Sequence, residues 1–242
     1  MYNKNVECKM YKLLSLLLFL VCRGIAATAS PLSALPLPAD TLASSPSLQM
    51  RDVFATLPDS ILPTVTRNNR LDCIDFIENN MEAKVRGSFG EYVTLEALTP
   101  TYLRFATSTS AYIEMKLLPA ADSLIICFVS TVVTGVDSLQ LKDSSVRFYT
   151  TGWQPLPASD FLAIPSVPDF CTGTVSSQSL VPLAKSAQRS LLDFHPIHAT
   201  LSPDSPALTL TLQIADLSIA ERKAARELVR PITKTWTDGK WK

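Results

Sequence analysis

The two histidines of the chain, His195 and His198, lie in the segment Asp193-Phe-His-Pro-Ile-His. Three-residue spacing suits two metal ligands on one face of a helix. Pro196 separates them, however, and the segment has the pattern of the start of a strand, which places the two rings on opposite or splayed faces. A surface or strand-edge position explains these histidines better, so we assign no metal ligand and no cofactor.

Nucleophilic and phosphate-binding motifs are absent from the sequence. It contains no G-x-S-x-G turn, and its seven glycines leave few tight loops in which a backbone can approach a ligand. No glycine-rich phosphate-binding loop is present either. These absences disfavour an acyl-transfer or nucleotide-dependent enzyme.

Acidic side chains offer another route to catalysis, because a carboxylate pair needs only closeness in space. The candidates form a helical set and a strand set: Asp72, Asp75 and Glu78, then Glu91, Glu96 and Glu114. A solvated helix face explains the first set, and we assign no catalytic residue.

Aromatic residues provide a candidate ligand or partner surface. Trp153, Tyr149, Trp236 and Trp241 lie near the ends of expected strands, where aromatic rings could form a binding platform. Packing in the core at strand ends is the competing explanation.

Three antiparallel strands over 111–118, 124–133 and 144–149 are the expected nucleus of the fold. In the first, Ile113, Met115 and Leu117 alternate with Tyr112, Glu114 and Lys116, which predicts one apolar and one polar face. The second is apolar almost throughout and β-branched, as in a central strand covered on both faces.

Two helices are expected before this nucleus. Met50, Val53, Phe54 and Leu57 have helical spacing, and Pro58 ends that helix. For the second helix, Asn69 is the predicted N-cap, with Asp72 at N3. Its end is predicted at Asn79-Asn80, and its expected apolar stripe is Leu71, Ile74, Ile77 and Met81.

Shorter elements complete the prediction. Two or three short strands are expected over 83–109, two of them at 92–98 and 101–106, and a hairpin with one solvated face at 197–201 and 208–214. Helices are expected at 180–192 and 219–229, the latter with a capping box of Ser218 and Glu221. A strand over 232–236 follows, with Asp238-Gly239 as a turn before Trp241.

The predicted fold class is α+β, with helices packed on antiparallel β-sheet. Two hairpins turn through Pro, Asp and Ser, at 117–124 and 201–208, and each is followed by a strand ending at a tryptophan. This pattern indicates two degenerate sheet-plus-helix halves, 48–165 and 178–242. The alternative is that hairpins of unrelated α+β proteins share these turn residues.

The N-terminus has the pattern of a secretory signal. Lys4, Lys9 and Lys12 precede the apolar run 13–21, and Ala27-Thr-Ala29 provides a cleavage site. The run is short for a membrane span. We expect a signal peptide over 1–29, a Pro- and Ser-rich flexible linker over 30–47, and one domain over 48–242. An uncleaved anchor and lipidation of Cys22 are the alternatives.

Charge and cysteine content constrain the partners. The chain has a formal net charge of zero, and loss of residues 1–29 removes four of its 22 basic and one of its 22 acidic residues. The mildly acidic remainder gives no sign of a nucleic-acid surface. Cys127 is expected to be a buried small hydrophobe, while a disulfide among Cys73, Cys127 and Cys171 stays open.

Several segments resemble a family of exported proteins of Gram-negative anaerobes, domain of unknown function number 3256. They are 50–63, 68–76, 115–118, 148–156 and 236–241, and the resemblance spans about residues 50–241. The family has no assigned activity. The resemblance therefore implies export to the periplasm or cell envelope and a single folded unit, but no catalytic residue.

Two function hypotheses follow. The first is an exported, non-catalytic envelope protein, not membrane-spanning after export, that binds a protein or peptide through a polar sheet face or a strand edge. The second is a hydrolase or small-ligand-binding protein with a carboxylate or Trp site in a sheet cleft. A pocket lined by carboxylates or tryptophans would favour the second.

Overall fold

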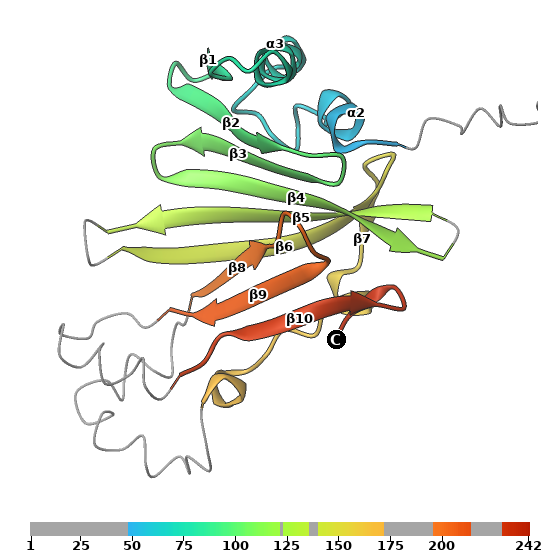
Figure 1. Cartoon of the computed structure of the whole chain (residues 1–242). Helices are drawn as coiled ribbons and strands as arrows, with labels where there is room; N and C mark the ends of the chain where they lie inside the picture. Colours follow the sequence, from blue (N-terminus) through green and yellow to red (C-terminus); the bar gives the residue numbers. More distant parts are fainter. Residues whose placement is uncertain (1–47, 122, 136–139, 172–195, 214–228) are drawn as a thin grey trace, which may run out of the picture. The chain divides into compact units, whose positions relative to one another are not determined.

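The computed structural model describes residues 48–121, 123–135, 140–171, 196–213 and 229–242 (Figure 1). These residues carry two α-helices and eleven strands. The first helix, α2 (Met50–Ala55), buries Met50, Val53 and Phe54, as its spacing predicts. Among the described residues, no helix has the length and apolarity needed to cross a membrane.

The second helix, α3 (Arg67–Glu78), begins earlier than predicted. Thr66 is the N-cap, and its hydroxyl accepts a hydrogen bond from the Asn69 N–H at 3.3 Å. Asn69 lies in the first turn instead, and its amide donates to the carbonyl oxygen of Arg86 at 2.6 Å. The predicted end at Asn79-Asn80 is confirmed.

The apolar stripe predicted for α3 is wrong in two of its four positions. Leu71 is 39% exposed and Met81, beyond the helix end, is 51% exposed. The buried face is formed by Arg70, Cys73 and Ile74. A buried arginine accounts for the error, because a pattern of apolar residues does not reveal it.

A seven-stranded antiparallel sheet, the long sheet, follows in simple sequence order. Its strands are β1 (Lys84–Arg86), β2 (Tyr92–Leu98), β3 (Tyr102–Ser108), β4 (Ala111–Ala120), β5 (Ser123–Thr134), β6 (Leu141–Thr150) and β7 (Pro155–Leu156). The five strands predicted in this region are confirmed. The two edge strands are short, which limits pairing with other chains.

A second antiparallel sheet, the small sheet, has the order β11-β10-β9-β8. Its strands are β8 (Ile197–Leu201), β9 (Ala207–Leu212), β10 (Ile232–Thr237) and β11 (Lys240–Trp241). Asp238 and Gly239, with φ of 53° and 74°, form the turn between β10 and β11. The predicted hairpin, final strand and turn are confirmed.

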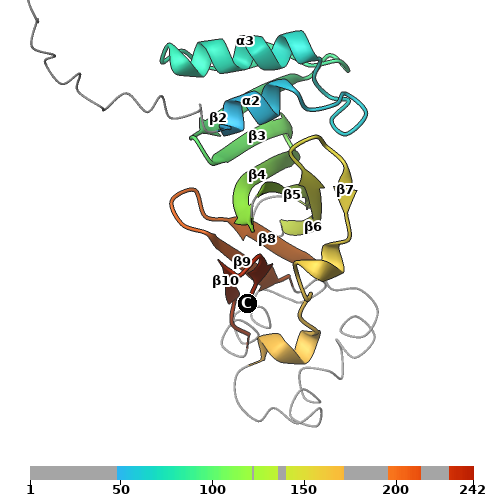
Figure 2. The same ribbon diagram turned by 90° about the vertical axis from the view of Figure 1, so that its right-hand side faces the viewer.

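Two hydrophobic cores lie on opposite faces of the long sheet. The first contains α2, α3 and side chains such as Phe105, Met115 and Phe128. The second contains the small sheet, the 3₁₀ turns η2 (Ala158–Asp160) and η3 (Val167–Phe170), and side chains such as Leu118 and Phe148. Figure 2 shows the helices on one side of the long sheet and β8–β10 on the other.

The fold class is confirmed in its coarse form: an α+β protein in which antiparallel strands predominate and described helices are few. The expected helix 180–192 lies outside the described residues. The same holds for the expected helix 219–229, except for Val229, which forms an isolated bridge with Cys171.

Candidate functional site

The four aromatic residues predicted as a ligand surface are divided between the two cores. Tyr149 and Trp153 pack in the first core, with ring centroids 5.6 Å apart. Trp236 and Trp241 pack in the second, with centroids 5.2 Å apart. The Trp236 indole N–H also donates to the carbonyl oxygen of Pro119 at 2.7 Å. All four are buried, so the structure joins them as two packed pairs and not as one platform.

The histidine and helix-carboxylate candidates lie apart from one another. His198 Nε2 is 2.8 Å from the Tyr112 hydroxyl, whereas His195 lies outside the described residues. Asp72, Asp75 and Glu78 are exposed on α3, as a solvated helix face requires. Within the described ranges, no group of three or more His, Cys, Asp or Glu residues could hold a metal.

The cysteines of the described residues form no disulfide with one another. Burial and the nearby charge of Asp72 raise the pKa of the Cys73 thiol to about 11, and burial also raises the pKa of Cys127. Both thiols are therefore protonated at neutral pH and unreactive. The prediction of Cys127 as a buried small hydrophobe is confirmed.

A polar cluster lies between the two sheets, centred on Glu114 of β4, which is 1% exposed. One of its carboxylate oxygens accepts from the Tyr102 hydroxyl at 2.7 Å and from Arg104 at 3.2 Å. Arg104 also donates to Glu96 at 2.6 Å. The structure thus gathers Glu96 and Glu114, two of the strand carboxylates, around one guanidinium group.

The same face of β4 holds the edge of the small sheet. The other Glu114 oxygen accepts from the Leu201 N–H at 3.4 Å, and Lys116 Nζ donates to the carbonyls of Ser202 and Pro203 at 2.8 and 2.7 Å. Ser144 of β6 accepts from the Ala199 N–H at 3.0 Å. The polar face predicted for residues 111–118 is therefore covered by β8.

Three side chains of this cluster have shifted pKa values. Burial and the hydrogen bond to Glu114 raise the pKa of Tyr102, and burial lowers the pKa of Lys116. Burial disfavours the charge of Arg104, but its bond to Glu96 and the charge of Glu114 together raise the pKa of that guanidinium. Because these groups are engaged with one another and with backbone groups, the cluster joins the sheets and is poorly suited to proton transfer.

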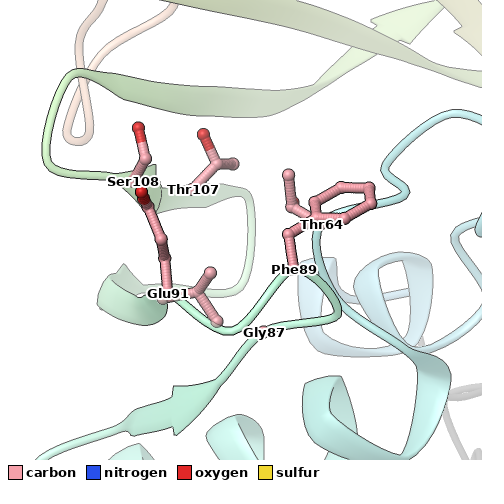
Figure 3. Close-up of a pocket in the computed structure, with 7 residues that line it drawn as sticks. Thr64, Gly87, Phe89, Glu91, Thr107 and Ser108 are labelled. Carbon is pink, nitrogen blue, oxygen red and sulfur yellow. The ribbon is translucent and has the colours of Figure 1, made fainter.

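A half-open cavity of about 250 Å³ lies beside the β1–β2 turn of the long sheet (Figure 3). Residues of three segments line it: Thr64 before α3, Gly87, Phe89, Glu91 and Val93 of the β1–β2 hairpin, and Thr107 and Ser108 at the end of β3. Thr107 and Ser108 lie across the cavity from Thr64 and Phe89.

Two glycines shape this hairpin. A Cβ atom at Gly87 would lie 2.6 Å from the Thr64 carbonyl oxygen, so only glycine permits the close approach. That oxygen accepts from the Ser88 N–H at 2.9 Å, which joins the hairpin to the segment before α3. Gly90 has a φ of 89°, a left-handed conformation that favours glycine. The turn between them carries Phe89.

The chemical groups of the cavity suit binding. Phe89 is 74% exposed, and Glu91 forms no ion pair within the described residues. The Thr64 hydroxyl is buried and has no hydrogen-bond partner among the described residues. The lining contains no side chain that could act as a base on a nearby nucleophile except Glu91 itself. We call the cavity and Phe89 the hairpin site.

Most of the hairpin site was not predicted from the sequence. Glu91 was a candidate strand carboxylate, but Phe89, Thr64 and the end of β3 were not predicted. One signal was present: Gly87 and Gly90 flank an aromatic residue in a chain that has only seven glycines. The contacts with Thr64 and Thr107 depend on tertiary structure and had no sequence signal.

Comparisons with known proteins agree with the predicted resemblance. A family model described as "Protein of unknown function (DUF3256)" matches residues 42–241. A solved domain of an uncharacterized protein from Porphyromonas gingivalis W83 is similar, with 28% identity and a TM-score of 0.66 over 79% of this chain and 96% of that one. No curated protein matches. The chain belongs to the DUF3256 family of proteins of unknown function.

Proposed function

We propose that the protein is exported to the cell envelope, is non-catalytic, and binds a protein or peptide partner through the β1–β2 hairpin. The observation that carries the proposal is the exposure of two aromatic side chains of this hairpin, Phe89 at 74% and Tyr92 at 62%. Aromatic residues are enriched where binding energy concentrates in interfaces.

The surface around these rings supports the proposal. Tyr92 is paired in register with Arg86, and the Lys84 ammonium lies 5.0 Å from the Tyr92 ring centroid. Glu96 and Arg104 continue the same face of the sheet toward the interior. The exposed Tyr92 ring with charged residues around it has the composition of a protein interface.

The non-catalytic part rests on how the ionisable groups are used. Glu114, Arg104 and Lys116 are engaged in holding the small sheet. In the hairpin site the Ser108 hydroxyl is 3.5 Å from the Ser110 hydroxyl, which is no base to activate it. A glycosidase-type mechanism would require a second carboxylate beside Glu91, and the described residues of the cavity lining include no carboxylate besides Glu91.

One observation favours the alternative of a small-ligand-binding protein. The hairpin site is a cavity of about 250 Å³ with a carboxylate and three hydroxyl groups on its walls. A ligand held in this cavity would share Phe89 with the proposed partner surface. The identity of the bound molecule therefore distinguishes the two functions.

Export is supported by the basic, apolar and small-residue pattern of residues 1–29. The test is N-terminal sequencing of the protein isolated from the envelope of the bacterium that produces it. A start near Ser30 is expected. An intact N-terminus in a cytoplasmic fraction would refute export.

Partner binding is tested by affinity capture of the tagged full chain from native envelope extract. A Phe89→Ser/Tyr92→Ser variant should lose the captured partner. A matched variant, Val132→Ser/Ile164→Ser, changes two other exposed apolar residues and should retain it. Equal capture by both variants would rule out the hairpin as the binding surface.

A further inference from the structure

We propose that the hairpin site binds a primary ammonium group, carried by a lysine side chain of the partner. The proposal rests on the proposed function and names the chemistry that the site recognises. It assigns three roles: Glu91 as the counter-ion, Thr107 and Ser108 as hydroxyl acceptors, and Phe89 as an aromatic wall.

The first argument is the balance of charge. Among the described residues that line the cavity, Glu91 is the one ionisable side chain, and none is Lys, Arg or His. Glu91 has no ion-pair partner among the described residues, although Arg86 lies close in sequence and donates to the Gly90 carbonyl oxygen at 3.1 Å. Glu91 is exposed, so a cation can reach its carboxylate and is attracted to its negative charge.

The second argument is the supply of acceptors. An ammonium group has three donors and no acceptor, so it requires oxygen atoms around it. The cavity offers the Glu91 carboxylate and the hydroxyls of Thr107 and Ser108.

The third argument is the apolar part of the lining. A cation near an aromatic face is stabilised by the ring quadrupole, and Phe89 places such a ring at the cavity. The methylene stem of lysine suits contact with Phe89 and Val93, while its ammonium reaches the oxygens. A volume of about 250 Å³ accommodates one such side chain.

A neutral sugar is the main competing ligand, because it also uses aromatic rings and hydroxyls. It would gain little from a single uncompensated carboxylate, and its binding would vary little with salt. Salt dependence and the effect of removing the charge therefore separate the two ligands.

The test is a titration of the ¹⁵N-labelled full chain with N-acetyl-lysine methylamide, followed by NMR. The uncharged analogue N-acetyl-norleucine methylamide and glucose are the comparison probes. The variant Glu91→Gln removes the charge, and the matched control Glu82→Gln changes an exposed glutamate outside the cavity lining.

The lysine probe should change the chemical shifts of the amide signals of Gly87, Phe89, Thr107 and Ser108. The norleucine probe should not change them. Glu91→Gln should weaken binding about three- to fivefold, as loss of a solvent-exposed ion pair does, whereas Glu82→Gln should leave it unchanged. Higher salt should also weaken it.

Equal shifts with norleucine, shifts with glucose alone, or no shift with any probe would overturn the ammonium proposal. So would lysine binding that Glu91→Gln leaves intact. Because partner capture by the hairpin is measured separately, a partner that is captured equally by Glu91→Gln would refute this inference and leave the proposed function standing.

Discussion

Glu114 is one of the residues through which the long sheet holds the edge of the small sheet. Its two oxygens contact Tyr102, Arg104 and the Leu201 N–H. A buried carboxylate is costly unless its oxygens are fully used, and here they are. Removing its charge would leave the buried part of Arg104 short of a partner and put a donor against Leu201.

The substitution Glu114→Gln should therefore lower the free energy of unfolding by about 2–4 kcal/mol. Glu96→Gln, which breaks the exposed side of the same arginine contact, should cost less than about 1 kcal/mol. Urea denaturation measures both. Similar losses for the two variants would show that Glu114 has no special part in joining the sheets.

His198 makes the stability of the protein depend on pH. Burial, with the nearby charges of Lys142 and Arg104, lowers the pKa of His198 from 6.5 to about 4. Between these values the unfolded chain binds a proton that the folded chain does not. The contribution of the neutral His198 to stability is therefore fully present above pH 6.5 and is lost progressively as the pH falls to about 4.

Replacement of His198 by Gln, which can still hydrogen-bond to Tyr112, should flatten this dependence. The measurement is the melting temperature of both proteins from pH 7.5 to 4.5. The melting temperature of the native protein should fall more than that of the variant as the pH is lowered over this range. Parallel curves would assign the pH dependence to other groups.

The roles of single residues were only partly predictable from the sequence. The alternation in β4 correctly placed Glu114 and Met115 on opposite faces of the strand, but it could not show that β8 covers the polar face. Likewise, the stripe of α3 was misassigned because Arg70, which donates to the carbonyls of Phe54 and Val65, occupies a buried position normally taken by an apolar residue.

At the scale of elements, the β1–β2 hairpin is the one whose geometry depends most on glycine. Its close contact with the Thr64 carbonyl brings together the segment before α3 and the turn that carries Phe89. The hairpin site therefore requires this contact. A shift of the turn by a few tenths of an ångström would change the spacing of Phe89 and Glu91 across the cavity.

The variant Gly87→Ala should lower the free energy of unfolding by about 1–3 kcal/mol, because its Cβ atom has no space beside backbone. At Gly152, a Cβ atom would meet its nearest neighbour at 3.8 Å, so Gly152→Ala should change stability by less than about 0.5 kcal/mol. Thermal denaturation compares them. Equal tolerance of both would mean that the turn adjusts freely.

Elements with strong local patterns were predicted well. β2 was placed correctly at both ends, and the turn at Asp238-Gly239 followed from a residue pair that favours left-handed φ. β1 was expected only as an unspecified third strand, because three residues carry too little alternation. Short elements held by neighbours have weak signals of their own.

At the scale of the whole molecule, the long sheet serves two cores at once. Phe105 and Met115 face the helices, while Leu118 and Phe148 face the small sheet with Leu208. Because adjacent residues of the same strands belong to different cores, loosening one core should weaken the other. We expect the two sheets to unfold together.

The three tryptophans allow a test of this coupling. In a Trp236→Phe/Trp241→Phe background, Trp153 is the sole tryptophan and reports on the first core. Adding Leu208→Ala in the second core should lower stability by about 2–5 kcal/mol. The urea midpoint of Trp153 fluorescence should fall together with that of far-UV circular dichroism. An unchanged Trp153 midpoint would mean independent unfolding.

The hairpin site could not have been predicted as a unit. Its residues come from three segments, near positions 64, 87–93 and 107–108, which tertiary folding brings together. The aromatic residues favoured by the sequence, Trp153 and Trp236, are buried in the cores. Aromatic type alone does not distinguish packing from binding, whereas exposure does.

The most direct test of partner binding is site-specific photo-cross-linking in the bacterium that produces the protein. A photoreactive phenylalanine analogue replaces Phe89, and a control carries it at Ile164, which is 71% exposed but belongs to the connector after η2. We predict one reproducible protein adduct from position 89 and none from position 164. No adduct from position 89, or the same adducts from both positions, would contradict the proposal that this hairpin binds a partner.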